Sequence, residues 1–208
     1  VVTGSGRTTI TGASGTTLNV DSAQLASDGA VDADNAELVI DGSAGVINVT
    51  AVERDVDASS FSGDLTLTTP AYNSADDTGG VTGSGTGDDN TPAFAVKVGS
   101  GNTTIDGADA DPDNTDIVDI EVDASALAGV SDSTLTLDGT AEYRVVNNGT
   151  GIARLDISAI ADDNTLTLEG TGGFELTGTQ ADIDATALSG EVQVRTLDDG
   201  QPTAIEVD

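Results

Sequence analysis

Polar and apolar residues alternate in several short runs of this chain, and such alternation gives a β-strand one buried face and one solvent-facing face. Turn residues such as Asp41-Gly42, Asp138-Gly139 and Glu169-Gly170 often follow a run, and a second short apolar run comes next. Each run therefore predicts a strand. The clearest runs are Leu38–Ile40, Leu65–Leu67, Leu135–Leu137, Leu166–Leu168 and Val192–Val194.

The sequence VDASALAG, Val122–Gly129, recurs in related forms along the chain. The five copies start at residues 20, 56, 122, 155 and 183, so they are 36, 66, 33 and 28 residues apart. The interval of 66 is about two of the others, which indicates a degenerate copy between Ala71 and Ile120. Recurrence at such a period is typical of stacked repeats. The other copies are VDSAQLAS at Val20–Ser27, VDASSFSG at Val56–Gly63, LDISAIAD at Leu155–Asp162 and IDATALSG at Ile183–Gly190.

Each repeat reads as three short strands closed by about one helical or 3₁₀ turn. The sequence therefore predicts an all-β fold, a right-handed parallel β-solenoid of about six three-stranded coils that covers residues 1–208 as a single domain. An antiparallel β-sandwich is the alternative; it explains the alternation but does not predict the recurring phrase. In the solenoid, one buried stack is expected to contain Leu67, Leu137, Leu168 and Val194.

Within the phrase, Asp123 and Ser125 are expected to cap the following turn, and Leu127 to fill a corner of the core. Stacking of the repeats would set Asp57, Asp123, Asp156 and Asp184 in one ladder. Two charges ~5 Å apart repel by ~0.8 kcal/mol even in water. Backbone hydrogen bonds or a cation must offset that repulsion.

The composition restricts the chemistry that the chain can perform. Its 208 residues carry 37 acidic and six basic side chains, a net charge of −31, and no Cys or His. These absences exclude disulfides, thiol or imidazole catalysis and the usual zinc sites. The negative charge disfavours nucleic acid and anionic membranes as partners, and no run approaches the ~18 apolar residues of a membrane span. No enzymatic activity is therefore expected.

The densest acidic stretch suggests a calcium site. Asp109, Asp111 and Asp113 repeat the spacing of the first three ligands of an EF-hand loop, although Asn114 replaces the glycine and Ile120 stands where the bidentate Glu belongs. A solvated acidic loop is the alternative reading, and adaptation to high salt would explain the acidity without specific sites. The candidate ligands are Asp106, Asp109, Asp111, Asp113 and Asp116.

Two further stretches match each other, GSGRTTITG at Gly4–Gly12 and GSGNTTIDG at Gly99–Gly107. They resemble the calcium-binding nonapeptide of RTX proteins, but Thr9 and Thr104 stand where the calcium-ligating Asp would be. Together with the VDASALAG phrase, they make the chain similar to the repetitive β-solenoid segments of bacterial RTX-type adhesins and surface-layer proteins. The resemblance implies secretion to the cell surface, a structural or adhesive role and calcium-assisted folding.

The expected function is that of a non-catalytic structural module of an extracellular surface layer, adhesin or filament, which self-associates end to end or in a lattice. Neither end resembles a cap, and Val207-Asp208 begins another phrase, so a segment of a longer chain is expected. Stretch 71–92 is expected to be a loop excursion. Cell-surface polysaccharide is a second expected partner. The alternatives are a polysaccharide-processing β-helix enzyme and a carbohydrate- or ice-binding face built from Thr66, Thr136 and Thr167.

Overall fold

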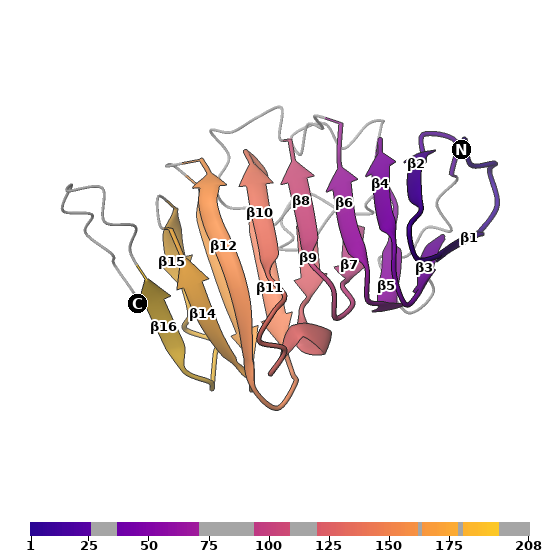
Figure 1. Ribbon diagram of the computed structural model, residues 1–208. Coiled ribbons are helices and arrows are strands. Elements are labelled where there is room, and N and C mark those ends of the chain that lie inside the picture. The colour runs from indigo at the N-terminus through magenta and orange to yellow at the C-terminus, as the bar shows by residue number, and fades with distance from the viewer. Residues whose placement is uncertain (26–36, 71–93, 109–119, 162–163, 179–180, 196–208) are drawn as a thin grey trace.

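The computed structural model of the chain consists almost entirely of β-strands (Figure 1). It describes residues 1–25, 37–70, 94–108, 120–161, 164–178 and 181–195. Within these residues the strands form two sheets of eight, and all neighbouring strands run parallel. The prediction of an all-β parallel solenoid is confirmed, and parallel pairing contradicts the alternative of an antiparallel sandwich.

One sheet contains the odd-numbered strands and the other the even-numbered strands, and they are called the odd and even sheets below. The odd sheet comprises β1 Thr8–Gly12, β3 Leu38–Gly42, β5 Val56–Phe61, β7 Phe94–Lys97, β9 Ile120–Asp123, β11 Tyr143–Asn147, β13 Thr165–Gly170 and β15 Asp182–Asp184. The even sheet comprises β2 Thr17–Asp21, β4 Val46–Thr50, β6 Asp64–Thr68, β8 Thr103–Gly107, β10 Leu135–Gly139, β12 Ile152–Ile160, β14 Gly173–Thr177 and β16 Val192–Arg195.

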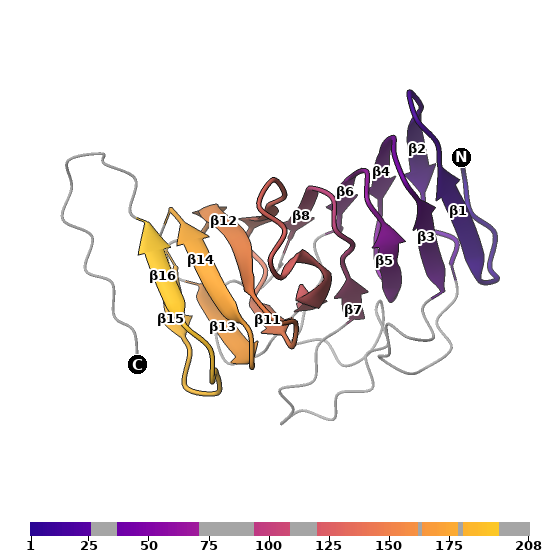
Figure 2. The ribbon, with the colours of Figure 1, turned by 60° about the horizontal axis from the view of Figure 1, so that its bottom comes forward.

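Consecutive strands of the chain lie in opposite sheets, so one coil contains two strands (Figure 2). The expected six coils of three strands were therefore wrong, because the described part of the chain forms eight coils of two. The five phrases begin in β2, β5, β9, β12 and β15. Most phrases are thus three strands apart, which is one and a half coils, and successive copies can fall in different sheets. Three strands per phrase was right for three of the four intervals, whereas the described residues between Val56 and Val122 contribute four strands from one phrase to the next. A phrase does not return to the same place in the coil.

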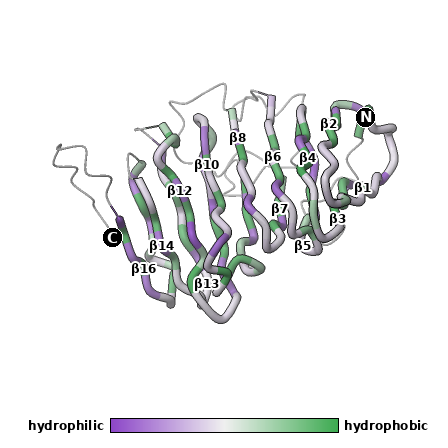
Figure 3. Tube along the Cα trace, in the orientation of Figure 1, coloured by the Kyte–Doolittle hydropathy of each residue, from purple (hydrophilic) through white to green (hydrophobic). Residues whose placement is uncertain are grey.

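The inner faces of the two sheets share one hydrophobic core, and hydrophobic and hydrophilic residues alternate along the strands (Figure 3). In the even sheet Leu67 and Leu137 lie in one row, joined by Ile105. Val194 belongs to a neighbouring row of the same sheet, and Leu168 lies in the odd sheet. The single stack expected from these residues was therefore wrong, for the same reason as the coil count.

Several strands end at a glycine where neighbouring backbones pass close to each other. Gly107 and Gly139 pair in register at the ends of β8 and β10. Gly139 has φ +95°, and a Cβ on it would lie 2.0 Å from the carbonyl oxygen of Gly107. Only glycine fits this position, because an added methyl group would overlap the neighbouring backbone. The Asp-Gly pairs in the sequence therefore mark strand ends.

Residues 69–93 separate β6 from β7, the longest interval between two consecutive strands of the described residues. The loop excursion expected at 71–92 and the final Val207-Asp208 lie outside the described residues, as does much of the stretch between Ala71 and Ile120 in which a degenerate copy is expected. The strands on either side of these segments keep their places in the two sheets.

Candidate functional site

The aspartate of each phrase accepts a hydrogen bond from the backbone N–H two residues later. Oδ1 of Asp57 accepts hydrogen bonds from the backbone N–H of Ser59 at 3.0 Å and from its hydroxyl at 2.6 Å. The same bond recurs in every copy. It holds a turn after Asp21, Asp123 and Asp184, which confirms the predicted capping role in these copies. After Asp57 and Asp156 the strands β5 and β12 continue, and the bond lies at a shift in strand register, so the predicted turn was wrong there. The pairs are Asp21 with Ala23, Asp57 with Ser59, Asp123 with Ser125, Asp156 with Ser158 and Asp184 with Thr186.

The aspartates do not form the expected ladder. Asp57 and Asp123 each pair in register with Lys97, which lies between them on β7. Asp156 lies in the even sheet beside Thr136, and Asp184 lies beside Thr167. A basic or hydroxyl-bearing neighbour thus takes the place of a second carboxylate, which removes the repulsion that direct stacking would cause.

Hydrogen bonds from the backbone and then the hydroxyl of Thr186 lower the pKa of Asp184 below its usual value, despite a small opposing effect of burial. A lowered folded-state pKa stabilises the fold above the unfolded-state value of about 3.9, and this contribution is lost as the pH falls through the folded-state value. Replacing Thr186 by valine keeps the backbone bond and removes the hydroxyl. The pKa of Asp184, followed by carbon NMR of its carboxyl group, should rise. An unchanged pKa would contradict this cause.

The apolar residue five positions after the start of each phrase fills a corner between the sheets. Leu127, at the end of the 3₁₀ helix Ser125–Leu127, is fully buried, which confirms its expected place and, for this copy, the single helical turn. The copies that begin at Val56 and Leu155 lie in continuous strands instead. Leu25, Phe61 and Ile160 are buried in the equivalent places, and Leu188 is partly buried. The phrase therefore combines a local aspartate–backbone hydrogen bond with a buried apolar residue and carries no reactive group.

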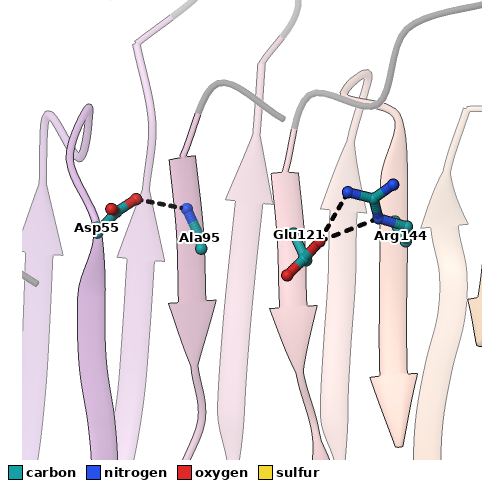
Figure 4. A network of polar contacts seen from close by, with 4 residues as sticks. All are labelled: Asp55, Ala95, Glu121 and Arg144. Carbon is teal, nitrogen blue, oxygen red and sulfur yellow. Dashed lines mark hydrogen bonds and ion pairs between the residues drawn. The ribbon is translucent and has the colours of Figure 1, made fainter. Parts of the chain in front are cut away.

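Arginines on the outer faces join neighbouring coils. Arg144 on β11 forms an ion pair with Glu121 on β9 at 2.7 Å, and the two are drawn in Figure 4. In the even sheet, Glu175 on β14 accepts from Arg154 at 3.0 Å and from Arg195 at 2.7 Å. Exposed pairs of this kind stabilise a fold by only ~0.2–1 kcal/mol each. Their main consequence is that these arginines neutralise carboxylates of the adjacent coil.

Sequence reasoning missed the buried polar residues that satisfy backbone groups between coils. Asp55 is only 4% exposed, and its Oδ1 accepts from the N–H of Ala95 at 2.7 Å (Figure 4). Glu142 accepts from the N–H of Thr165 at 2.8 Å, and fully buried Asn147 donates to the carbonyl of Gly173 at 2.8 Å. A polar residue directly before a strand, as in Asp55-Val56 and Glu142-Tyr143, is the signal that could have identified two of them.

Only one of the expected calcium ligands lies in the described residues. Asp106 is exposed on β8 and pairs in register with Asp138 on β10 and with Thr68 on β6. Asp109, Asp111, Asp113 and Asp116 lie outside the described residues. In the part of the chain that is described, no three acidic side chains come close enough to hold a metal ion. Asp106 and Asp138 form a pair of neighbouring carboxylates.

A row of hydroxyl side chains follows the outer face of the even sheet. Thr66, Thr104 and Thr136 pair in register on β6, β8 and β10 and are half-buried. Asn19 and Asn48 continue the row, and their amides are hydrogen-bonded at 2.9 Å. Thr167 lies in the odd sheet, so its expected place in this row was wrong.

At both ends of the described coils, some apolar side chains of the core are only partly buried. Leu18 at one end and Leu188, Val192 and Val194 at the other are only partly buried, whereas Leu137 in the middle is fully buried. Among the described strands, β1, β15 and β16 pair on one side only, whereas Val1–Thr3 lie beside β2 and form three hydrogen bonds with Asn19 and Asp21. A further coil at either end would cover apolar surface and pair free backbone groups.

Comparisons of the chain with protein-family models, curated proteins and solved structures found no significant match. In the described part of the chain, no helix has the length and apolar character needed to cross a membrane.

Proposed function

We propose that the chain is a non-catalytic structural module of an extracellular surface layer, adhesin or filament, and that it acts by stacking end to end. The observation that carries this proposal is the state of the two ends, where unpaired strand edges and partly exposed apolar rows lie in the described coils. Stacked parallel coils gain stability from each neighbour that covers them. The acidic composition and the resemblance to surface repeats support the extracellular location.

Sedimentation velocity over a range of protein concentrations tests the proposal. The chain should be measured with calcium at about 0.15 M ionic strength, where the Debye length is ~8 Å and the negative charges of two copies repel weakly. Species of increasing mass, in multiples of the 20.6 kDa chain, are expected as the concentration rises. A single 20.6 kDa species at every concentration would contradict end-to-end stacking.

The absence of catalysis is part of the same proposal. The described aromatic residues Phe61, Phe94, Tyr143 and Phe174 are all buried in the core, so in these residues no aromatic side chain lines an outer groove for a sugar. Sugar-binding pockets usually combine aromatic side chains with a few polar groups. Incubation with acidic polysaccharides should therefore give no cleavage. Release of shorter products would favour a polysaccharide-processing enzyme instead.

Binding of cell-surface polysaccharide is a second candidate, favoured by the row of Thr66, Thr104 and Thr136 on the even sheet. Hydroxyls repeated at one strand spacing present regular donors and acceptors. Replacing Thr104 by valine removes the central hydroxyl but keeps the shape, and Thr167 to valine is the matched control on the other sheet. Co-sedimentation with insoluble polysaccharide should weaken in the first variant alone. Equal binding by both variants would count against this face.

A further inference from the structure

Arg7 lies immediately before β1 at one end of the solenoid and is exposed. Among the described residues its guanidinium has no ion pair or hydrogen bond, although the chain contains 37 acidic side chains. Arg144, Arg154 and Arg195 each pair with a glutamate of an adjacent coil. Arg7 has no preceding coil within the described residues that could supply such a partner.

The strand register gives Arg7 and Asp184 equivalent positions at opposite ends of the odd sheet. Residues that pair in register on successive strands form a row across the odd sheet. One such row runs from Thr8 on β1 to Leu168 on β13, and Arg7 directly precedes Thr8. Asp184 pairs with Thr167, which directly precedes Leu168. The row consists of Thr8, Leu38, Val56, Val96, Val122, Val145 and Leu168.

We propose that a second copy of this chain stacks head to tail, with its β1 beside β15 of the first copy, and that its Arg7 pairs with Asp184 across the junction. This inference rests on the proposed end-to-end function and specifies its contact. Thr186 occupies only Oδ1 of Asp184, so Oδ2 is available to the arginine. This ion pair would resemble the one between Arg144 and Glu121, which also pair in register on neighbouring strands and lie in the same row of the odd sheet.

The same register matches apolar residues at the junction. Leu188 forms a β-bridge with Gly170. In the register of the odd sheet, Leu188 therefore lies in the same row as Ile10 on β1. In the even sheet, Leu18 and Val194 begin and end one row. Leu18, Leu188 and Val194 are only partly buried, and the junction would cover Leu188 against Ile10 in the odd sheet. In the even sheet Val1–Thr3 lie beside β2, so Val194 would meet this segment of the second copy.

Charge also selects the orientation of the second copy. A tail-to-tail contact would bring Asp182 and Asp184 of one copy against the same residues of the other, whereas β1 carries no carboxylate. Like charges directly opposite each other destabilise strand pairing. A head-to-tail contact leaves a free edge at each end, so it produces open linear assemblies.

Charge-removing variants test the contact by sedimentation at about 0.15 M ionic strength, where exposed ion pairs are still measurable. Arg7→Gln and Asp184→Asn, which keeps the Oδ1 acceptor, should each weaken association about two- to fivefold, and combining them should add little. Arg7→Glu should weaken it about tenfold, because it places two carboxylates together. Asp132→Asn removes an exposed charge between β9 and β10 and should not weaken association.

Cysteine pairs give a second readout, because the natural chain has no cysteine. Within one copy, seven strand spacings of ~4.8 Å separate β1 from β15, so a disulfide between residues 7 and 184 can form only between copies. Oxidised Arg7→Cys/Asp184→Cys should form linear ladders, and Arg7→Cys/Gln193→Cys, with its second cysteine in the even sheet, should not.

The outcomes separate this contact from the proposed function. Wild-type chain that never exceeds one copy would overturn both. Wild-type assembly that is insensitive to the Arg7 and Asp184 variants, with equal ladders from both cysteine pairs, would overturn the junction and leave end-to-end stacking in place. Weakened assembly in these variants and ladders from the first cysteine pair alone would support the junction.

Discussion

Replacing Gly139 by alanine is expected to destabilise the solenoid by about 3–5 kcal/mol, because two penalties coincide at this position. The backbone has φ +95°, a conformation that costs an alanine ~1–2 kcal/mol. The new methyl group would also lie 2.0 Å from the carbonyl oxygen of Gly107, so β8 and β10 must separate locally. Urea denaturation of the variant and the wild type measures the loss.

Gly129 to alanine is the matched control for this prediction. Gly129 has φ +81°, but no atom lies within 4 Å of the Cβ that alanine would add. The control should therefore lose only the conformational part, ~1–2 kcal/mol. Equal losses in the two variants would show that close approach of the strands does not govern stability at the ends of β8 and β10.

Removing calcium and salt is expected to lower the melting temperature by roughly 10 °C, the equivalent of about 3 kcal/mol for a chain of this size. The reason is the net charge of −31, which the few basic residues cannot neutralise. At ~0.01 M salt the Debye length reaches ~30 Å, so carboxylates on many neighbouring coils repel one another. Circular dichroism with chelator at low ionic strength measures this shift. An unchanged melting temperature would contradict the expectation.

Bound calcium and general screening predict opposite effects of one substitution. Asp106 to asparagine relieves its repulsion with Asp138 on the neighbouring strand, so under screening alone the variant should melt higher than the wild type at low salt. If Asp106 helps to bind calcium, the variant should instead lose part of the stabilisation that calcium provides. Equal stabilisation of the wild type by calcium and by sodium chloride at matched ionic strength would favour adaptation to salt.

Local patterns in the sequence predicted the local structure well. Alternation in runs such as Leu135–Leu137 identified buried strand faces, and Asp123 and Leu127 take the roles that their chemistry indicated. These features depend on a few consecutive residues. The side-chain period of a strand and the geometry of an aspartate-capped turn are therefore sufficient to predict them.

The arrangement of coils could not be predicted in the same way. A phrase every three strands fits one coil of three strands as well as one and a half coils of two, and only the pairing of strands distinguishes them. For this reason Asp57 and Asp123 lie beside Lys97, and Asp156 lies in the other sheet. Buried Asp55 and Asn147 also escaped notice, because their partners Ala95 and Gly173 are distant in sequence.

Small-angle X-ray scattering over a concentration series tests end-to-end stacking most directly, since it reports length and cross-section separately. Eight coils at ~4.8 Å give about 40 Å per copy along the solenoid axis. With calcium at about 0.15 M ionic strength, the maximum dimension should grow in steps of this size while the cross-sectional radius of gyration stays constant. A particle that keeps the length of one copy at all concentrations, or one that thickens instead of lengthening, would contradict the account.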